Sequence, residues 1–437
     1  MIVKDGLKTS QRKCLFAAFK RRLTKEVKVA QLSGYISEQA AYHHGEMSLQ
    51  KTIVGLAQDF VGSNNINLFL PNGQFGTRLQ GGKDSASERY IYTLLNPMTY
   101  LLFPELDNPI LTYKDDDGTP VEPDFYGPII PMILVNGGKG IGTGFSTDIP
   151  SFNPKQIVQY IKNKLRNKSN ASTIIEPFYR GFKGKITKIS PKKYLFQGIY
   201  QVLSTQRVRI TELPIGMWTQ DYKQFLEKMM EKKDSILRDY QDMSTEKNVE
   251  ITLTLKKGAL MALISKMGDN NCPMFDKKFR LYTTKTTSNM HLFDSEQRMK
   301  HYKTIEDIID DYFPVRLALY EKRRKYLIDA LKKLVAVLHN KARFIEEQCE
   351  DIIDLRRKTK VMISEILAQR EYNMVDGTYN YLMSMPFSSV LEENIKSLRR
   401  ERDKKKVDLK KIEDTTPQHM WRIELKKLSK IYNKKQI

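Results

Sequence analysis

The spacing of hydrophobic residues differs between three consecutive regions of the chain, and each spacing predicts a different kind of structure. In residues 1–150, apolar residues recur at helical intervals between loops rich in Gly, Asn and Pro. We expect helices over 11–28, 47–60 and 86–102, with a loop over 72–82. Short helices separated by tight turns in a basic segment favour a helix-turn-helix or winged-helix domain.

The second region, residues 151–305, has the pattern of an α+β domain. Apolar and polar residues alternate over 184–189, 194–203, 208–214 and 249–255, as they do in half-buried strands. Antiparallel strands with helices on one side would satisfy this alternation.

Residues 306–437 are predicted to be helical and highly charged. Apolar residues repeat every seven positions, as in the seam of a coiled coil, in two complementary series: Tyr320, Leu327, Leu334 and Leu331, Leu338, Ile345. The repeat is interrupted over 379–387 and resumes over 390–412. A long helix, a compact knob and a returning helix would form an antiparallel arm. The chain as a whole is therefore predicted to be an α+β multidomain protein.

The net charge of the chain limits the classes of partner that it is expected to bind. The 437 residues include 73 Lys and Arg against 51 Asp and Glu, a net charge of +22. Such an excess is self-repulsive and is usually retained for a polyanionic partner, either nucleic acid or an acidic membrane surface. No apolar run is long enough to span a bilayer, and the first residues lack the apolar core of a secretory signal. We expect an intracellular protein that does not cross a membrane.

Several local patterns do not form the site that they suggest. Three distant cysteines cannot build a disulfide framework or a four-cysteine zinc site. The glycine-rich run 137–144 does not fit the phosphate-binding loop, because Gly140 follows Lys139. It does not fit the dinucleotide fingerprint either, because Thr143 or Phe145 stands where the third glycine is needed. The acidic run 115–118 is typical of a solvated turn. His43 and His44 lack a partner at helical zinc spacing and could be surface histidines. We expect no cofactor bound by this chain itself.

The order of longer motifs is more specific. The chain carries five phrases in succession: Asp5-Gly-Leu-Lys-Thr-Ser-Gln-Arg-Lys, Ala41-Tyr-His-His-Gly-Glu, Asn72-Gly-Gln-Phe-Gly-Thr-Arg, Gly81-Gly-Lys-Asp-Ser-Ala-Ser-Glu-Arg-Tyr, and the run 128–144. This series resembles the DNA breakage-reunion region of type IIA DNA topoisomerases, specifically the eukaryotic topoisomerase II form. The resemblance continues through 176–182 and 211–219 into the predicted arm, so it covers nearly the whole chain.

The resemblance implies that Tyr90 is the nucleophile, with Arg89 beside the scissile phosphate and His44 bonding a phosphate oxygen or steering a proton. The chemistry suits these residue types. A tyrosyl-phosphate ester keeps the energy of the phosphodiester, so a cut strand can be resealed without ATP. A phenol is mostly protonated at pH 7 and needs a base or a nearby positive charge, which a guanidinium supplies.

The same resemblance implies a set of DNA contacts. The residues expected to contact the phosphate backbone are Lys8, Arg12, Lys13, His43, Arg78 and Lys83. Ile141 matches the residue that the family wedges between base pairs, although it could instead plug a glycine-rich turn. Trp218 matches a DNA-facing position, and core packing is an equal alternative for it.

The family's organisation supplies further expectations. It implies a winged-helix cleavage domain at 1–150, a tower domain at 151–305 and a coiled-coil arm at 306–437, whose knob near 370–395 pairs with its twin. Double-stranded DNA and a second copy of the chain are then the partners, since each Tyr90 cuts one strand. The ATP-hydrolysing and acidic metal-binding domains of the family are missing here. We therefore expect a fragment that is inactive alone and depends on those domains for Mg²⁺ and ATP.

The source of the chain affects where it would act. Glu88 stands where the family usually has a small residue, and Phe125 replaces a usual tryptophan. Such divergence would suit an enzyme of a large DNA virus. We expect a nuclear location for a cellular protein, and the host cytoplasm or nucleus for a viral one.

Two other functions are compatible with parts of the sequence. A non-catalytic scaffold that bridges DNA through its coiled-coil arm needs only the positive charge and the heptads. The combination of Arg89 and Tyr90 with His44 argues against it, because a scaffold has no need of them. A tyrosine recombinase fits less well, because neither the arginine–histidine spacing nor the extended arm suggests it.

Overall fold

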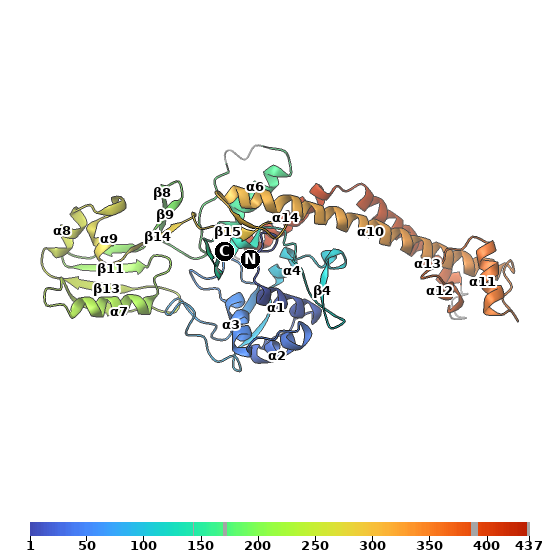
Figure 1. Ribbon diagram of the computed structural model, residues 1–437, viewed down its shortest axis with the longest axis horizontal. Helices are drawn as coiled ribbons and strands as arrows, with labels where there is room; N and C mark the ends of the chain where they lie inside the picture. Colours follow the sequence, from blue (N-terminus) through green and yellow to red (C-terminus); the bar gives the residue numbers. More distant parts are fainter. Residues whose placement is uncertain (143, 169–172, 386–391, 435–437) are drawn as a thin grey trace. The chain divides into compact units, whose positions relative to one another are not determined.

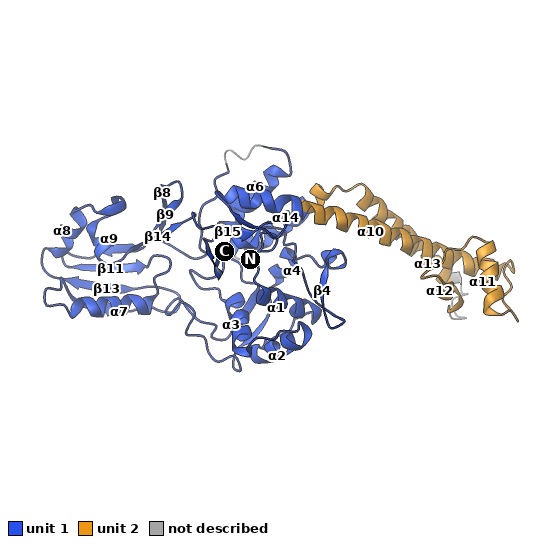
Figure 2. Ribbon diagram, in the orientation of Figure 1, with its two compact units in different colours: residues 1–316, 422–437 blue, residues 317–421 orange. Residues whose placement is uncertain are grey.

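The structure is a computed structural model that describes residues 1–142, 144–168, 173–385 and 392–434. It divides into two compact units, which are distinguished in Figure 2. Unit 1 comprises residues 1–316 and 422–437, and unit 2 comprises residues 317–421. Helices and strands are mixed in unit 1, whereas unit 2 is helical (Figure 1).

Three helices and a small sheet form the N-terminal part of unit 1. The helices α1 (Thr9–Lys20), α2 (Val29–Gln39) and α3 (Glu46–Ala57) pack against one another. Strand β3 (Tyr92–Leu95) lies antiparallel between β1 (Val27–Lys28) and β2 (Phe69–Asn72). The central strand therefore begins two residues after Tyr90.

Two of the predicted helices in this part are wrong in extent. The helix expected over 86–102 is replaced by β3, and α4 (Pro97–Leu102) begins only after Asn96, whose side chain caps it. Sheet pairing on both sides of β3 overrides the helical spacing there. The helix expected over 11–28 ends at Lys20, because Arg22 adopts a left-handed conformation and the chain continues into β1.

Other predictions in this part are confirmed. The helix expected over 47–60 is α3, and the segment after β2 is a loop. The acidic run 115–118 ends β4 (Tyr113–Asp116) and makes the turn into β5 (Thr119–Pro123), where Gly118 N donates to Asp115 Oδ1 at 2.9 Å. The remaining elements of this stretch are η1 (Glu105–Ile110), α5 (Met132–Asn136), β6 (Gly138–Gly142), β7 (Phe145–Ile149) and α6 (Pro154–Lys164).

Two antiparallel sheets follow, as the alternation predicted. One has the order β14-β9-β8 and the other β10-β11-β13-β12. The run expected as one strand over 194–203 is two strands, because the chain passes from one sheet to the other at Gly198. A Cβ there would lie 2.3 Å from the Glu212 carbonyl oxygen. The strands are β8 (Lys185–Ser190), β9 (Lys193–Gln197), β10 (Ile199–Val202), β11 (Arg207–Glu212), β12 (Leu237–Asp242), β13 (Ile251–Leu255) and β14 (Tyr282–Thr286).

The four-stranded sheet forms a hydrophobic core with its helices. Helix α7 (Thr219–Met230) packs on β12, burying Tyr222 and Leu226 against the apolar residues of β11 and β13. Helices α8 (Ala259–Ser265) and α9 (Met274–Lys278) add further apolar side chains to this core. The short helix η2 (Asp269–Asn271) connects them.

The last part of unit 1 contains a hairpin, the first residues of α10 (Ile305–Cys349) and most of α14 (Pro417–Lys434). The hairpin is β15 (His291–Phe293) with β16 (Met299–His301), and it precedes α10. Helix α14 returns to the same unit. Arg316 of α10 is fully buried and pairs with Asp107 at 2.6 Å and with Glu424 of α14 at 3.8 Å.

Unit 2 contains the helices predicted from the heptads. Helix α13 (Glu392–Glu413) is the returning helix, and Arg324 of α10 donates to the Thr415 carbonyl just beyond its end at 2.9 Å. Tyr320 and Ile345 are buried, whereas Leu334 is 36% exposed. Between α10 and α13 lie α11 (Lys360–Gln369) and α12 (Asn380–Met383), packed in a small apolar cluster. Residues 386–391 of the predicted knob lie outside the described residues.

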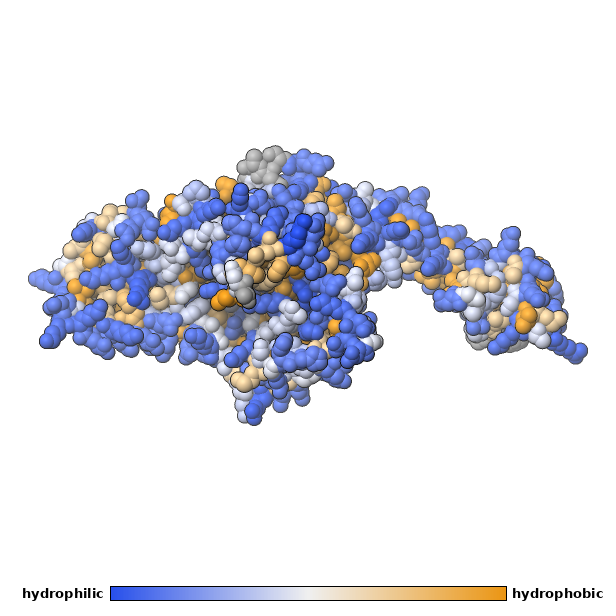
Figure 3. Space-filling view, in the orientation of Figure 1, coloured by the Kyte–Doolittle hydropathy of each residue, from blue (hydrophilic) through white to orange (hydrophobic). Residues whose placement is uncertain are grey.

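The surface agrees with the composition. Hydrophilic residues dominate the face drawn in Figure 3, in keeping with a chain in which 28% of the residues are charged. Among the helices of the described ranges, none combines the length and the apolar content that a membrane crossing needs.

Candidate functional site

The segment between β2 and β3 carries Arg89 and Tyr90, and it is held in place without regular secondary structure. Gln58 Nε2 donates to two carbonyl oxygens of the segment, at Phe75 (3.0 Å) and Gly82 (3.2 Å). A backbone bond from Ala86 N to the Gln74 carbonyl (2.9 Å) closes the loop on itself. Cross-links of this kind fix a loop by satisfying its backbone groups one by one.

Close backbone approach requires two of the glycines in this loop. A Cβ on Gly76 would lie 2.5 Å from Gly82 Cα, and both residues have positive φ angles, +95° and +84°. Other residues are strained in such conformations. Thr77 N also donates to Asp84 Oδ1 at 2.9 Å across the same turn. The loop therefore needs glycine at positions 76 and 82, where the backbone approaches itself closely with positive φ angles.

The loop is also fastened to the start of α7. The carbonyl oxygens of Arg78 and Leu79 accept from the first amides of α7, at Thr219 (3.4 Å) and Gln220 (2.9 Å). These amides have no partner within the helix, so the loop caps it. The Arg78 guanidinium also pairs with the buried carboxylate of Glu212. The loop is thereby joined to α7 by backbone bonds and to the four-stranded sheet by an ion pair.

The side chain of Arg78 lies elsewhere than a direct phosphate contact would need. It is buried and directed at Glu212, so it anchors the loop and is not presented to a phosphate. Trp218 is half-buried and packs over Gly81, where a Cβ would lie 2.3 Å from the indole ring, and edge-on to Phe60 at 5.8 Å. The packing alternative left open for Trp218 is the one that this geometry favours.

The backbone next to Tyr90 is bonded to the start of α2. Ala30 N donates to the Glu88 carbonyl (3.1 Å), and Val29 N donates to the Ile91 carbonyl (3.0 Å). Tyr90 N itself donates to the Ser87 carbonyl at 2.9 Å. The phenol therefore projects from a backbone that is fixed on both sides, and its side chain is 72% exposed. Arg89 is also exposed, so a phenol and a guanidinium are adjacent and accessible.

The two histidines lie on the connection between α2 and α3. Both are exposed; His43 Nε2 lies 3.8 Å from Asp116 Oδ2, and the His44 ring meets Tyr42 edge-on at 5.4 Å. Lys13 holds this connection in place, because its Nζ donates to the Ala40 carbonyl at the end of α2.

Lys13 is less available to DNA than the sequence suggested. Its Nζ also pairs at 2.8 Å with Glu122, whose carboxylate is almost fully buried. The lysine is thus placed between a buried carboxylate and the Ala40 carbonyl. We interpret it as a residue that positions the histidine connection, rather than as one that contacts a phosphate directly.

Arg12 is also turned inward, against expectation. Its Nε lies 2.8 Å from Asp5 Oδ2, and Asp5 also accepts from the backbone amides of Leu7 and Tyr126 at 3.0 Å each. Burial alone would lower the pKa of Arg12, but the hydrogen bond and the charge of Asp5 raise it overall. The arginine therefore stays charged inside the protein and organises the first motif.

Three of the predicted DNA contacts are exposed. Lys8 stands at the N-terminus of α1, where its backbone amide donates to Gln11 Oε1 at 2.9 Å, and its side chain is free to extend outward. Lys83 is exposed on the segment between β2 and β3 that also carries Tyr90. Ile141 is 90% exposed on strand β6, which excludes the alternative that it plugs a turn.

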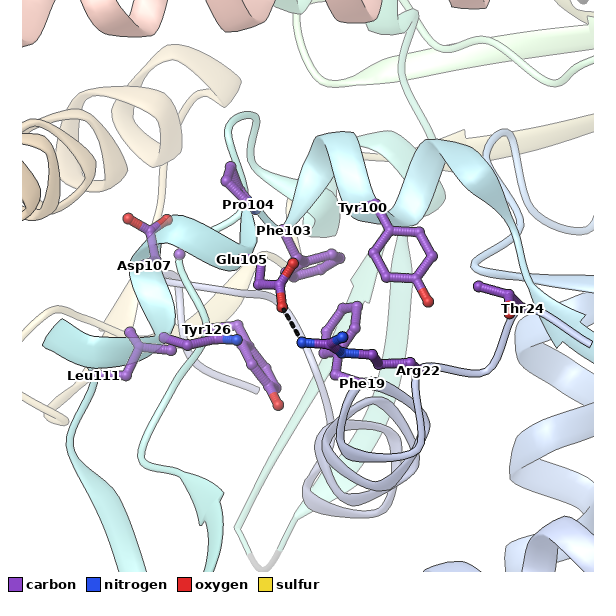
Figure 4. Close-up of a pocket in the computed structure, with 12 residues that line it drawn as sticks. Phe19, Arg22, Thr24, Tyr100, Phe103, Pro104, Glu105, Asp107, Leu111 and Tyr126 are labelled. Carbon is purple, nitrogen blue, oxygen red and sulfur yellow. Dashed lines mark ion pairs between the residues drawn. The ribbon is translucent and has the colours of Figure 1, made fainter. Parts of the chain in front are cut away.

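A separate cavity of about 290 Å³ lies beside α1, α4 and η1 (Figure 4). Aromatic rings of Phe19, Tyr100 and Tyr126 line it, and Arg22 and Glu105 pair at 3.8 Å across its edge. Burial raises the pKa of Tyr100, Glu105 raises it further and Arg22 opposes the shift. None of the residues expected to form the site contributes to this cavity.

The sequence did not reveal the acidic partners of the buried cations. Asp5, Glu122 and Glu212 are nearly or fully buried and each accepts from a basic side chain. Asp5 and Glu212 belong to the quoted motifs, so a signal was present, but a motif does not say which cation an acid faces. Within the ranges that the structure describes, no cluster of three or more His, Cys, Asp or Glu could hold a metal ion.

Comparisons with known proteins agree with these motifs. Residues 2–426 match the A-subunit family of DNA gyrase/topoisomerase IV. The chain is 41% identical over 471 residues to DNA topoisomerase 2 of Arabidopsis thaliana, covering 98% of this chain and 31% of the relative. It is 39% identical over 444 residues to the mitochondrial DNA topoisomerase 2 of Dictyostelium discoideum, covering 98% and 33%.

A solved structure is also similar. The crystal structure of the Plasmodium falciparum topoisomerase II DNA-binding, cleavage and re-ligation domain matches with a TM-score of 0.90 and 38% identity, covering 99% of this chain and 61% of that chain. The chain spans about a third of the length of the two relatives named above. By the match over residues 2–426 and these identities, the chain belongs to the DNA gyrase/topoisomerase IV family of type IIA topoisomerases.

Proposed function

We propose that this chain is the DNA-binding, cleavage and religation part of a type II DNA topoisomerase, with Tyr90 as its nucleophile. The observation that carries the proposal is the exposed phenol of Tyr90 beside the exposed Arg89, on a backbone bonded to α2 and closed by loop cross-links. A rigid, accessible nucleophile is what an in-line attack requires, because orientation supplies much of the rate.

The chemical step is a transesterification. The Tyr90 oxygen forms a bond to phosphorus while the bond from phosphorus to a deoxyribose oxygen breaks. The phenol proton leaves to a base or to water, and the departing deoxyribose oxygen takes up a proton. One phosphate ester replaces another, so the step is close to neutral in energy and reverses when the deoxyribose oxygen attacks in turn. Nothing is oxidised or reduced.

The exposed basic residues assist this step in different ways. Arg89 would bond two oxygens of the phosphate as negative charge develops, which is the role that a planar guanidinium fills best. His44 would bond a nonbridging oxygen or move the proton. Lys8 and Lys83 would hold the flanking phosphates. Arg12, Lys13 and Arg78 would act indirectly, by positioning the elements that carry the others.

Ile141 would bend the duplex. An apolar side chain that is 90% exposed and flanked by glycines can approach stacked bases closely. Bending brings the two cut sites into the geometry in which a pair of chains can act. The family resemblance and the exposure of Ile141 support this role.

We propose the finer organisation on the same grounds. Residues 1–150 would be a winged-helix domain, 151–305 a tower and 306–437 a coiled-coil arm through which two copies pair as a homodimer. ATP and Mg²⁺ would be used through domains outside this chain, and no step above is routed through a metal. The protein would act inside the cell, in the nucleus if it is cellular.

The test is a Tyr90→Phe variant of the complete enzyme, which removes one oxygen from the proposed nucleophile. Covalent protein–DNA complexes trapped by denaturation should disappear, while DNA binding persists. Tyr92→Phe is the matched control, since Tyr92 lies two residues away and is 37% exposed. Covalent complexes that survive in Tyr90→Phe would show that the nucleophile is misassigned. Binding without any nicking by the unaltered enzyme would instead favour a DNA-bridging scaffold.

A further inference from the structure

The hairpin that carries Ile141 needs support from outside itself. Strands β6 and β7 form a two-stranded sheet, and Ile141 on β6 pairs directly with Ser146 on β7. Isolated two-stranded hairpins are marginally stable in water, and β6 contains glycine at positions 138, 140 and 142. Unstacking a base step costs a few kcal/mol. A marginally stable hairpin would deform at that cost, and Ile141 would not separate the base pairs.

The support comes from a distant segment of the chain, residues 288–293, which we call the brace. The Asn289 carbonyl accepts from Asp148 N at 2.9 Å, and Asn289 Nδ2 donates to Ser146 Oγ, also at 2.9 Å. Asn289 therefore holds the residue directly opposite Ile141. The ring of Phe293 meets Phe145 of β7 edge-on, with centroids 6.1 Å apart. All three contacts reach β7, which leaves the strand that carries Ile141 to face a duplex.

The side chain of Asn289 is itself oriented by a histidine. His291 Nδ1 lies 2.9 Å from Asn289 Oδ1 and donates to it, which turns the amide nitrogen toward Ser146. The His291 ring stacks on His301 across the β15–β16 hairpin at 4.5 Å. His301 Nε2 donates in turn to the Ser288 carbonyl at 2.8 Å. The two stacked rings therefore hold Asn289, which contacts the β6–β7 hairpin, and Ser288, the residue before it.

The brace is anchored on two further sides. Val3 N donates to the Phe293 carbonyl at 2.8 Å, and Phe293 N donates to the Met1 carbonyl at 3.1 Å, so the N-terminal segment pairs with β15. At the other end of the hairpin, Lys300 Nζ lies 3.3 Å from Asp311 of α10, which also accepts from the Tyr302 hydroxyl. Contacts at several points hold the brace in place, so it can keep the β6–β7 hairpin from being displaced.

We infer that Asn289 and Phe293 are positioning residues that hold the Ile141 wedge against the stacked bases. The inference rests on the proposed function, since it assigns to these residues a part in bending the cleaved duplex. They act through Ser146 and Phe145, without contacting the reacting phosphate. Their loss should reduce base unstacking and bending more than it reduces the affinity for DNA, because the phosphate contacts of Lys8 and Lys83 remain.

The experiment measures unstacking and bending by the 437-residue chain. A duplex carries 2-aminopurine at each candidate step in turn, whose fluorescence rises on unstacking, and a dye pair at its ends reports the bend. We expect Asn289→Ala and Ser146→Ala to lower the fluorescence gain about fivefold, the effect of one ordinary hydrogen bond on an equilibrium. Phe293→Leu, which removes the edge-on ring, should lower it by a similar factor.

Conservative and matched variants separate positioning from general damage to the fold. Asn289→Asp should keep the signal, because a carboxylate can accept from both His291 and the Ser146 hydroxyl. Asn163→Ala is the control, since Asn163 is also half-buried and bonds side chains on two sides, Gln159 and Thr173. It should leave unstacking unchanged. A loss in Asn163→Ala equal to that in Asn289→Ala would overturn the inference.

Ile141→Ala distinguishes the failure of the brace from the failure of the wedge. It should abolish the fluorescence gain, and adding Asn289→Ala to it should cause no further loss. If Ile141→Ala abolishes the gain but the brace variants keep it, the inference is overturned and the proposed function stands. If Ile141→Ala keeps the gain, the wedge is wrong and the brace with it, whereas cleavage by Tyr90 is judged separately by covalent trapping.

Discussion

Two arginines from motifs of the same family lie in opposite environments. Arg89 is on the loop between β2 and β3, and Arg12 is in the interior beside α1. Arg89 is exposed on a fixed backbone next to Tyr90, whereas Arg12 is buried and bonded twice to Asp5. The same contrast separates the exposed Lys83 from Lys13, which pairs with Glu122. The basic residues of these motifs are therefore of two kinds, some exposed and others paired with buried acids of the protein itself.

The two kinds of site respond to different perturbations. A charge that is buried with its partner destabilises the protein strongly when the partner is removed, because the remaining charge has no water to solvate it. An exposed cation contributes little to the free energy of unfolding. When it binds a phosphate, it displaces counterions from the DNA, so binding depends on salt. Stability and the salt dependence of DNA binding are therefore the two measurements that test the comparison.

The largest expected effect is on stability, from Arg12→Ala. Removing this guanidinium leaves the Asp5 carboxylate buried without its ion pair, and we expect the free energy of unfolding to fall by about 3–5 kcal/mol. Urea unfolding of the chain measures it. Arg89→Ala is the matched control and should be within about 0.5 kcal/mol of the unaltered chain. Unchanged stability in Arg12→Ala, with weaker and less salt-dependent DNA binding, would make Arg12 a phosphate ligand after all.

The next effect is on cleavage, from Arg89→Ala in the complete enzyme. The loss of a charge aimed at the developing negative charge should slow covalent complex formation about a hundredfold to a thousandfold. Single-turnover cleavage of a duplex measures the rate. Arg22→Ala, which removes another exposed arginine, two residues after the end of α1, should leave the rate unchanged. A normal rate in Arg89→Ala would remove Arg89 from the site.

A smaller effect distinguishes the two lysines by salt. Lys83→Ala should reduce the slope of log affinity against log salt by about 1, the contribution of one phosphate contact, with little change in stability. Lys13→Ala should leave the slope unaltered and lower the stability instead. Fluorescence anisotropy across a salt series gives both slopes. If the two variants lose slope equally, the division between the exposed lysine and the lysine paired with Glu122 does not hold.

The smallest effect compares an exposed ion pair with the buried ones. Arg22 has a left-handed backbone with φ of 49° and pairs loosely with Glu105 at 3.8 Å. Glycine adopts this conformation without strain, so Arg22→Gly should change the free energy of unfolding by less than about 1 kcal/mol. Thermal unfolding measures the change. A large loss would mean that the exposed pair matters as much as the buried one.

Local pattern was enough for much of the fold. The helix expected over 47–60 and the strands over 208–214 and 249–255 are present, because their hydrophobic residues repeat at the period of the structure that they form. The helix expected over 86–102 was wrong because its residues also satisfy the central strand β3. A short apolar run can follow either period, and the neighbouring strands decide which one it adopts.

The sequence by itself determined the family, the order of its motifs and the identity of Tyr90, Arg89 and Ile141 as candidates, since these depend on residues that are adjacent in the chain. Only the tertiary structure decided which basic residues face outward. The acids that draw three of them inward lie 7, 109 and 134 residues away, at Asp5, Glu122 and Glu212. The cost of burying a carboxylate without a partner is what selects these pairs, and that cost exists only once the chain has folded.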